Sequence, residues 1–232
     1  MTTPTTRLIA HTLPYPIARA ICAIDAEPAH APERKLLHLL YALESLMQLL
    51  GSVTLVDAFE SRENLSVRPL LKRLRRDTHL SLGLWGWALG ELAPRLPNPF
   101  MPELTALAQS DDFKSRLERL SAERNRLAHP ARAIDPDEAR GRLAELRPDF
   151  DALVESIAFL GGYHLVGAPE AAQPVRRGTR AMLAPLRGRR VSSRDIPLVF
   201  EGNIAVHDVA LINPAVSVAL VLRPFFALTR SV

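Results

Sequence analysis

The sequence predicts a mainly α-helical bundle followed by a small antiparallel β-sheet, and three patterns along the chain support this. Long segments of the first two thirds repeat aliphatic residues every three or four positions, as amphipathic helices do. The end of the chain holds short β-branched segments bounded by turn residues. Between them lies a stretch of arginine, proline and glycine with neither pattern. We therefore divide the chain into a helical bundle over 13–168, an arginine-rich linker over 169–194 and a β segment over 195–232.

The strongest predicted helix is "PERKLLHLLYALESLMQLLGSVTLVDAF", whose apolar positions alternate in steps of four and three. The stripe consists of Leu36, Leu40, Leu43, Met47 and Leu50, widened by Leu39 and Leu46. So broad an apolar face suits a helix packed inside a bundle. Glu44 sits at the edge of the stripe, where we expect a partly exposed salt-bridge partner.

Further helices are predicted on both sides of this one. The chain turns helical around Ile17, and "LSVRPLLKRLRRD" forms a short amphipathic segment with a basic side. "THLSLGLWGWALGELAPRL" follows, with Thr78 or Ser81 as its N-cap and both tryptophans in the core. The next helix runs from about Asp112 to His129.

After that helix, "AIDPDEARGRL" restarts the chain as a helix. Asp135 is the expected N-cap, Pro136 takes the first helical position, and acidic residues occupy the first turn. We expect a last helix in "DFDALVESIAFLGGYHLV", ended by Gly167 and Pro169.

The predicted β segment contains "DIPLVF", "NIAVHDVALI" and "VSVALVLRPFFAL", separated by Glu-Gly-Asn and Asn-Pro turn signals. These segments predict an antiparallel sheet of three or four strands. Because so small a sheet rarely stands alone, we expect it to pack on the helices or on another chain.

Composition narrows the classes of function. The chain has 232 residues, 47% of them hydrophobic but only 6% aromatic, so aliphatic side chains must fill its core. One cysteine, Cys22, excludes an internal disulfide and a cysteine zinc cluster. The histidines show no metal spacing, so we expect neither metal nor cofactor. The net charge of +4 permits an acidic partner such as nucleic acid.

The ends and apolar runs of the sequence bear on its compartment. "MTTPTTRLIA" lacks the charged and apolar regions of a signal peptide, and the longest uninterrupted aliphatic run, "VSVALVL", is too short for a bilayer. We expect a soluble cytoplasmic protein without a membrane partner.

The candidate site is "ERNRLAHP", residues 123–130. On a helical wheel, Arg124 falls among the leucines of its helix instead of opposite them. A buried guanidinium without a partner is costly and never loses its proton. Arg124 should therefore pair with an acid, perhaps Glu44, or open into a polar cleft that binds an anion.

His129 points roughly 140° away from Arg124 on an unbroken helix. Pro130 disfavours the helical conformation of the residue before it. We therefore expect the helix to fray at His129, which frees the imidazole to turn back towards Arg124. Asn125, one step round from Arg124, would orient His129 or bind a phosphate oxygen.

This set of side chains suits metal-free cleavage of RNA, whose 2′-hydroxyl is its own nucleophile. Histidine carries protons near neutral pH, and the arginine fork matches phosphate oxygens and stabilises developing charge. One histidine does not easily serve as acid and base together, but two copies across a dimer divide the work. The structural alternative makes Arg124 an ion-pair residue and His129 a C-terminal cap favoured by the helix dipole.

"RNRLAH" resembles the Arg-x4-His motif of the HEPN superfamily, helical nucleotide-binding and ribonuclease domains of prokaryotic toxin, defence and CRISPR systems. Arg124, Asn125 and His129 match its pattern of arginine, polar residue and histidine. The helical segments "LLYALESLMQLL", "LSLGLWGWALGEL" and "ALVESIAFLGGYHLV" resemble the frame of such bundles, and "VLRPFF" resembles a closing β segment. Glycine commonly follows the motif histidine, whereas this chain has Pro130.

The resemblance implies a HEPN-like helical bundle over 13–168 and a homodimer that places two Arg/His pairs in one cleft. It also implies metal-independent endoribonuclease activity, in a toxin–antitoxin or phage-defence system with an antitoxin or other partner protein. Arg124, Asn125 and His129 would be catalytic. Many members of the superfamily are inactive, so the alternative is a non-catalytic module for dimerisation or for binding nucleotides or a partner.

Other arginines are candidates for binding RNA phosphates. Arg126 lies next to the motif, and Arg176 and Arg177 open an arm that reaches Arg194 without an acidic residue. The alternative for the arm is a solvated, flexible linker. "LLKRLRRD" as a helix-turn-helix fragment is disfavoured, because no small-residue turn joins it to a second short helix.

Overall fold

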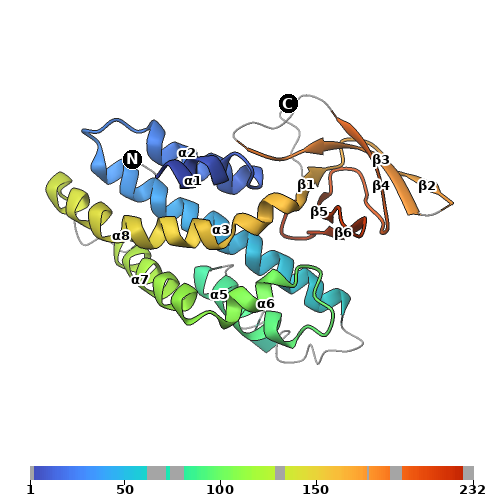
Figure 1. The fold of residues 1–232 in the computed structure, drawn as a ribbon, viewed down its shortest axis with the longest axis horizontal. Coiled ribbons are helices and arrows are strands. Elements are labelled where there is room, and N and C mark those ends of the chain that lie inside the picture. The colour runs from blue at the N-terminus through green and yellow to red at the C-terminus, as the bar shows by residue number, and fades with distance from the viewer. Residues whose placement is uncertain are drawn as a thin grey trace.

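The computed structural model describes residues 3–61, 72–73, 81–128, 134–176, 178–188 and 195–226. In these residues the chain is mainly helical and ends in an antiparallel sheet, which confirms the predicted fold class (Figure 1). The α-helices are α1 (Pro4–Ala10), α2 (Tyr15–Ala26), α3 (Pro32–Glu60), α5 (Leu82–Leu92), α6 (Glu103–Gln109), α7 (Asp111–Ala128) and α8 (Pro136–Ser156). The predicted segment "LSVRPLLKRLRRD" lies outside the described residues, except for positions 72–73.

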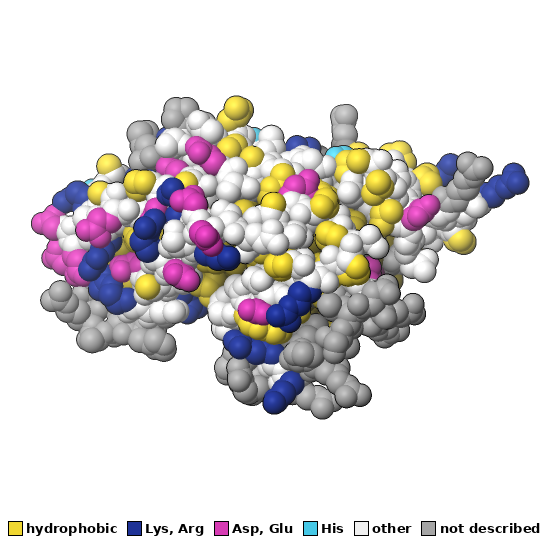
Figure 2. Space-filling view, turned by 60° about the horizontal axis from the view of Figure 1, so that its bottom comes forward, with side chains coloured by type: hydrophobic (Ala, Val, Ile, Leu, Met, Phe, Trp, Pro, Cys, Tyr) yellow, Lys and Arg dark blue, Asp and Glu magenta, His cyan; other side chains and the backbone are white. Residues whose placement is uncertain are grey.

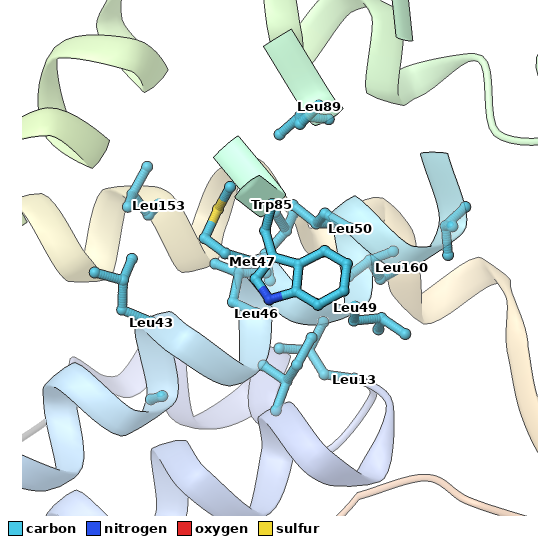
Figure 3. Close-up of a cluster of buried hydrophobic side chains, with 14 of the residues drawn as sticks. Leu13, Leu43, Leu46, Met47, Leu49, Leu50, Trp85, Leu89, Leu153 and Leu160 are labelled. Atoms are coloured by element: carbon cyan, nitrogen blue, oxygen red, sulfur yellow. The ribbon is translucent and has the colours of Figure 1, made fainter. Parts of the chain in front are cut away.

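Helix α3 is the centre of the bundle, with α2, α5 and α8 packed around it (Figure 1). The predicted stripe from Leu36 to Leu50 is buried at every position. In Figure 3, Leu46, Met47 and Leu50 of α3 lie against Trp85 of α5. The close fit of α5 on α3 depends on Gly51, because a Cβ atom there would lie 2.9 Å from the Trp85 Cα. The core is thus aliphatic, as the low aromatic content predicts.

Among the described helices, α3 is also the one that is long and apolar enough to cross a bilayer by length and composition. Within the bundle, 78% of its most apolar 18-residue window is buried against other parts of the chain. Burial of this kind is typical of a core helix.

Helix boundaries follow the capping residues that the sequence indicates. The Ser81 hydroxyl accepts a hydrogen bond from the Leu84 N–H at 3.3 Å, so Ser81 is the N-cap of α5. The Asp135 carboxylate accepts from the Asp137 N–H at 2.8 Å, and Pro136 begins α8. Both of these predictions are confirmed.

The predicted last helix is wrong at its C-terminal end. Helix α8 runs without interruption through Pro148 and ends at Ser156, a 3₁₀ turn follows (Ala158–Gly162), and His164–Gly167 form strand β1. All four residues of β1 pair with strand β5. Pairing with a distant segment, which local periodicity does not report, decides the conformation here.

The sheet has six strands and curls into a half-barrel with a core of its own. Its strands are β1 (His164–Gly167), β2 (Gln173–Val175), β3 (Gly178–Pro185), β4 (Ile196–Phe200), β5 (Val209–Asn213) and β6 (Val218–Val221). The strand order is β2-β3-β1-β5-β6, and β4, which is outside this order, pairs with β3. Every ladder is antiparallel. A bridge between Glu201 and Val218 brings the end of β4 to β6, which curls the sheet.

The predicted linker over 169–194 is not a linker in its described residues, since it contains β2 and β3. Along β3, Thr179, Ala181 and Leu183 are buried while Arg180 and Met182 are exposed. This period-two alternation is the pattern of a half-buried strand. The arginine content masks it because the charged side chains lie on the outer face.

The sheet is fastened to the bundle, as expected for so small a β unit. The Tyr15 N–H donates to the Leu186 carbonyl at 2.8 Å, and the Gly188 N–H donates to the Leu13 carbonyl at 3.0 Å. The Arg187 guanidinium donates to the carbonyls of Thr12 and Gly161, both at 2.9 Å. These bonds tie the end of β3 to the turn between α1 and α2.

Candidate functional site

Arg124 lies on the side of α7 that faces the bundle, as the helical wheel predicts. Its neighbours Phe113 and Leu120 are buried, while the Arg124 side chain remains 30% exposed. Its Nε donates a hydrogen bond to the Glu44 carboxylate on α3, and the two side chains form an ion pair. The predicted partner is confirmed, and the cost of placing a cation beside leucines is thereby reduced.

The ion pair does not close the site, because it lines a cleft of about 140 Å³. Its walls are Glu44, Gln48, Leu82, Trp85 and Arg124, contributed by α3, α5 and α7. Glu44 and Gln48 stand one helical turn apart on α3 and give the cleft a polar wall. Leu82 and Trp85 give it an apolar wall. Arg124 therefore both pairs with an acid and lines a polar cleft, which were the two alternatives that the sequence indicated.

The Arg124 guanidinium keeps unused donors. Nε is engaged by Glu44, and one N–H of the Nη1 group donates to the Asn125 Oδ1 at 3.3 Å. A guanidinium has five N–H donors. No other hydrogen bond joins it to the part of the chain that the structure describes, so among those residues its remaining donors have no partner.

Asn125 is exposed and faces a second hollow beside the first. This groove, of about 290 Å³, lies between α5 and α7, and Leu82 belongs to both cavities. Arg124 and Asn125 thus open into adjoining spaces. In the free protein, the Asn125 side chain accepts a hydrogen bond from the Arg124 guanidinium at 3.3 Å.

Of the other predicted site residues that the structure describes, Arg126 and Arg176 lie away from Arg124. Arg126 pairs with Glu123 at 2.7 Å and with Glu138 at 3.2 Å, so it faces α8 instead of the cleft. Arg176 is exposed at the end of β2 on the sheet and lines neither cavity. Arg177 and His129 lie outside the described residues. The role of His129 stays a prediction.

Sequence reasoning missed Gln48 as a member of the cleft and assigned Trp85 to the core alone. Gln48 follows Glu44 by four positions, so a helical wheel of α3 places both polar side chains on one edge of the leucine stripe. That spacing was the available signal. Trp85 is 4% exposed and belongs to the core as predicted, but its edge also lines the cleft.

Most cations of α7 are held by acids and add little free positive charge. Arg119 binds Asp149 of α8 with two hydrogen bonds of 2.8 and 2.7 Å. Arg116 joins Asp112 at 2.8 Å and Asp149 at 3.0 Å. Figure 2 shows acidic and basic side chains intermixed at the left end of the molecule, over α7 and α8. The cleft is therefore distinguished by the position of Arg124, not by a surplus of cations.

Neither a metal-binding cluster among the described residues nor a match to a known protein indicates what this site does. Within the described ranges, no group of three His, Cys, Asp or Glu side chains is arranged to hold a metal ion. Comparison of the chain with protein-family models, with curated proteins and with solved structures found no match.

Proposed function

We propose that this chain is a metal-independent endoribonuclease of the HEPN type, which cleaves RNA through attack by the 2′-hydroxyl. The observation that carries the proposal is the Arg124 guanidinium, oriented by Glu44 and Asn125 and open to a cleft. Arg124 also belongs to the motif Arg124–Asn125–His129, which resembles that of HEPN ribonucleases. In this motif His129 is the proposed proton carrier.

In this proposal Arg124 binds the scissile phosphate. When the 2′-oxygen attacks, negative charge grows on the non-bridging oxygens, and a fixed guanidinium stabilises that charge without reorganising. The Glu44 contact fixes the direction of the fork and leaves the Nη donors for the phosphate. Asn125 limits rotation of the guanidinium from the other side.

His129 carries protons in the proposed mechanism. An imidazole can accept the 2′-hydroxyl proton or donate one to the leaving 5′-oxygen, but a single copy does not readily do both. A homodimer with two clefts at its axis would divide these steps. Leu37 and Tyr41, 45% and 50% exposed, lie on the same face of α3 as Glu44 and offer apolar surface for such a contact.

The proposed setting is a cytoplasmic toxin–antitoxin or phage-defence system, in which a partner protein restrains the nuclease. An unrestrained ribonuclease degrades cellular RNA. Expression of the wild type should therefore slow growth, and Arg124→Ala should relieve the effect. Normal growth with the wild type and the variant at equal expression would argue against a toxin.

The ion pair itself favours a second candidate, a non-catalytic HEPN-like module for dimerisation or for binding nucleotides or a partner. Glu44 satisfies Arg124 in part, so a structural role alone accounts for the pair. The two candidates differ in whether the cleft does chemistry.

The deciding assay incubates purified protein with labelled RNA in EDTA. The ribonuclease proposal expects cleavage by the wild type and loss of cleavage in His129→Ala. Arg119→Ala serves as the control, because it removes an arginine from α7 that lies outside both cavities. Intact RNA with the wild type, or equal cleavage by His129→Ala, would exclude this mechanism.

A further inference from the structure

The groove between α5 and α7 has two walls of contrasting chemistry. Polar residues of α7 follow one another at steps of four and three positions, which places them on a single helix face. They are Lys114, Glu118, Ser121 and Asn125, and the apolar Leu117 lies among them on the same wall. The α5 wall consists of Leu82, Gly83, Gly86 and Trp87, which are apolar or have no side chain.

The two glycines keep the α5 wall open. A Cβ atom built on Gly86 meets nothing within 4 Å, and one on Gly83 meets only the Ser81 hydroxyl at 3.8 Å. Glycine lowers helix stability by about 1 kcal/mol relative to alanine. Among the described residues, no helix packs against Gly83 or Gly86, in contrast to Gly51, which Trp85 contacts closely. Their effect is to leave space in the groove.

A planar ligand with polar edges matches these walls. One face of a nucleobase would lie against the glycines and Trp87, and its edge would meet the amide, hydroxyl and carboxylate of α7. Stacking on an aromatic ring is a usual source of affinity for single-stranded nucleic acid. The Arg73 guanidinium, 5.2 Å from the centre of the Trp87 ring, and Lys114 place cations near this end of the groove.

We propose that this groove is a nucleoside subsite, which holds an unpaired base of single-stranded RNA next to the phosphate bound by Arg124. The proposal rests on the proposed function, because the order of base and phosphate follows from Arg124 as the phosphate ligand. Leu82 borders both cavities, and Arg124 and Asn125 are consecutive, so a nucleotide can pass from one space to the other. Duplex RNA, whose bases are stacked and paired, would not fit.

The test fills the groove without disturbing the fold. Gly86→Leu projects a side chain into the open space of the groove, and leucine favours the helix more than glycine does. Gly90→Leu is the matched control, since Gly90 lies one turn further along α5, also meets nothing within 4 Å, and does not line the groove. The probe is a short fluorescent 2′-O-methyl oligonucleotide, which binds without being cleaved.

The expected result is a rise in Kd of about tenfold or more for Gly86→Leu, the loss that one stacked base implies. Gly90→Leu should stay within about twofold of the wild type, and thermal melting should show both variants folded. The same oligonucleotide annealed to its complement should bind the wild type more weakly than the single strand does.

The outcomes separate this inference from the proposed function. Equal binding by Gly86→Leu and the wild type overturns the subsite, even if the wild type cleaves RNA. Weaker binding by Gly86→Leu supports the subsite, even if the wild type fails to cleave and the catalytic proposal is lost. Absence of binding by the wild type also overturns the subsite, while the cleavage assay in EDTA still decides the ribonuclease proposal.

Discussion

Arg124 forms an ion pair inside the fold and also lines a cleft that could hold a ligand. Its Nε donates to Glu44, but the side chain also lines a cleft and remains partly exposed. A lysine has a single ammonium group and cannot hold Glu44 and bind a phosphate in the same fixed geometry. The geometry of the fork, not only its charge, should therefore matter.

Arg124→Lys is predicted to reduce RNA cleavage about 10²- to 10³-fold, the usual cost of removing one fixed donor to transition-state charge. The rate of cleavage under single-turnover conditions measures this effect. Arg119→Lys is the matched control and should cleave within about twofold of the wild type, because Arg119 is exposed and lies away from the cleft. Full activity of Arg124→Lys would show that charge alone suffices.

Asp57 offers a test of electrostatics inside the fold. It is 6% exposed, and its carboxylate accepts a hydrogen bond of 2.7 Å from the Phe100 N–H. Burial raises the pKa of Asp57 above its ordinary value of 3.8, against the opposing effect of the Phe100 hydrogen bond. Burial, followed by the nearby charge of Asp57, also raises the pKa of Glu60.

A raised carboxyl pKa means that the folded state holds the proton more tightly than the unfolded state does. Asp57 therefore favours folding most at low pH, and this contribution is lost as the pH rises through its pKa in the folded protein. Asp57→Asn keeps an acceptor for Phe100 and removes the ionisation. Urea unfolding should show this variant gaining stability relative to the wild type as the pH is raised. A relative loss over the same range would contradict the burial argument.

At the residue scale, the sequence indicated the inward position of Arg124 and its pairing with Glu44, since both follow from helical geometry. The sequence did not show that Arg126, unlike Arg124, faces away from the cleft, because the partners of Arg126 include Glu138 on the following helix. Which cation is occupied and which is available depends on how helices pack, and a single helical wheel does not contain that information.

At the scale of elements, the contact of α3 with α5 sets the shape of the cleft. Gly51 allows the backbone of Trp85 to approach α3, and Trp85 then forms part of the apolar wall opposite Glu44. Any residue larger than glycine at this point would push α5 away from the core.

Gly51→Ala is predicted to destabilise the protein by about 1–3 kcal/mol, the cost of overpacking a tight core. Gly90→Ala, on the open side of α5, should stabilise it by up to about 1 kcal/mol through helix propensity. Chemical denaturation measures both. A stability for Gly51→Ala equal to that of the wild type would mean that α5 is not held closely at this contact.

The helices were predictable because their apolar stripes and capping residues are local signals. The strands over residues 164–185 were not recognised, although β3 alternates buried and exposed residues correctly. Arginine on its outer face and neighbouring proline and glycine made the segment resemble a linker. Strand β1 follows a helix directly and gains its conformation from β5, which lies more than forty residues further along the chain.

At the scale of the whole molecule, some buried residues of the sheet belong to the core of the bundle, while the others form the separate core of the sheet. Residues of the sheet region are buried in the same cluster as α3, α5 and α8. They are Leu165, Leu186, Val209, Leu211, Leu220 and Leu222. Trp85 also packs edge to face on Phe225, with ring centres 5.4 Å apart. The division into a bundle and a separate β segment therefore understates how closely the two parts are joined.

This shared part of the core predicts that bundle and sheet unfold together. Calorimetry should record a single transition whose calorimetric and van't Hoff enthalpies agree. Two resolved transitions, one of them retained in a chain ending before the sheet, would show that the parts fold independently.

In the proposed mechanism, the Arg124 cleft directs the 2′-hydroxyl of RNA onto the adjacent phosphate. The most direct measurement maps a wild-type cleavage site in EDTA, replaces the ribose 5′ to that phosphate by 2′-deoxyribose, and determines the product ends. We expect 2′,3′-cyclic phosphate ends in the unmodified RNA, no cut at the substituted position, and no product at either position with Arg124→Ala. Cleavage that persists at the deoxy position, or that is unchanged in Arg124→Ala, would contradict this mechanism.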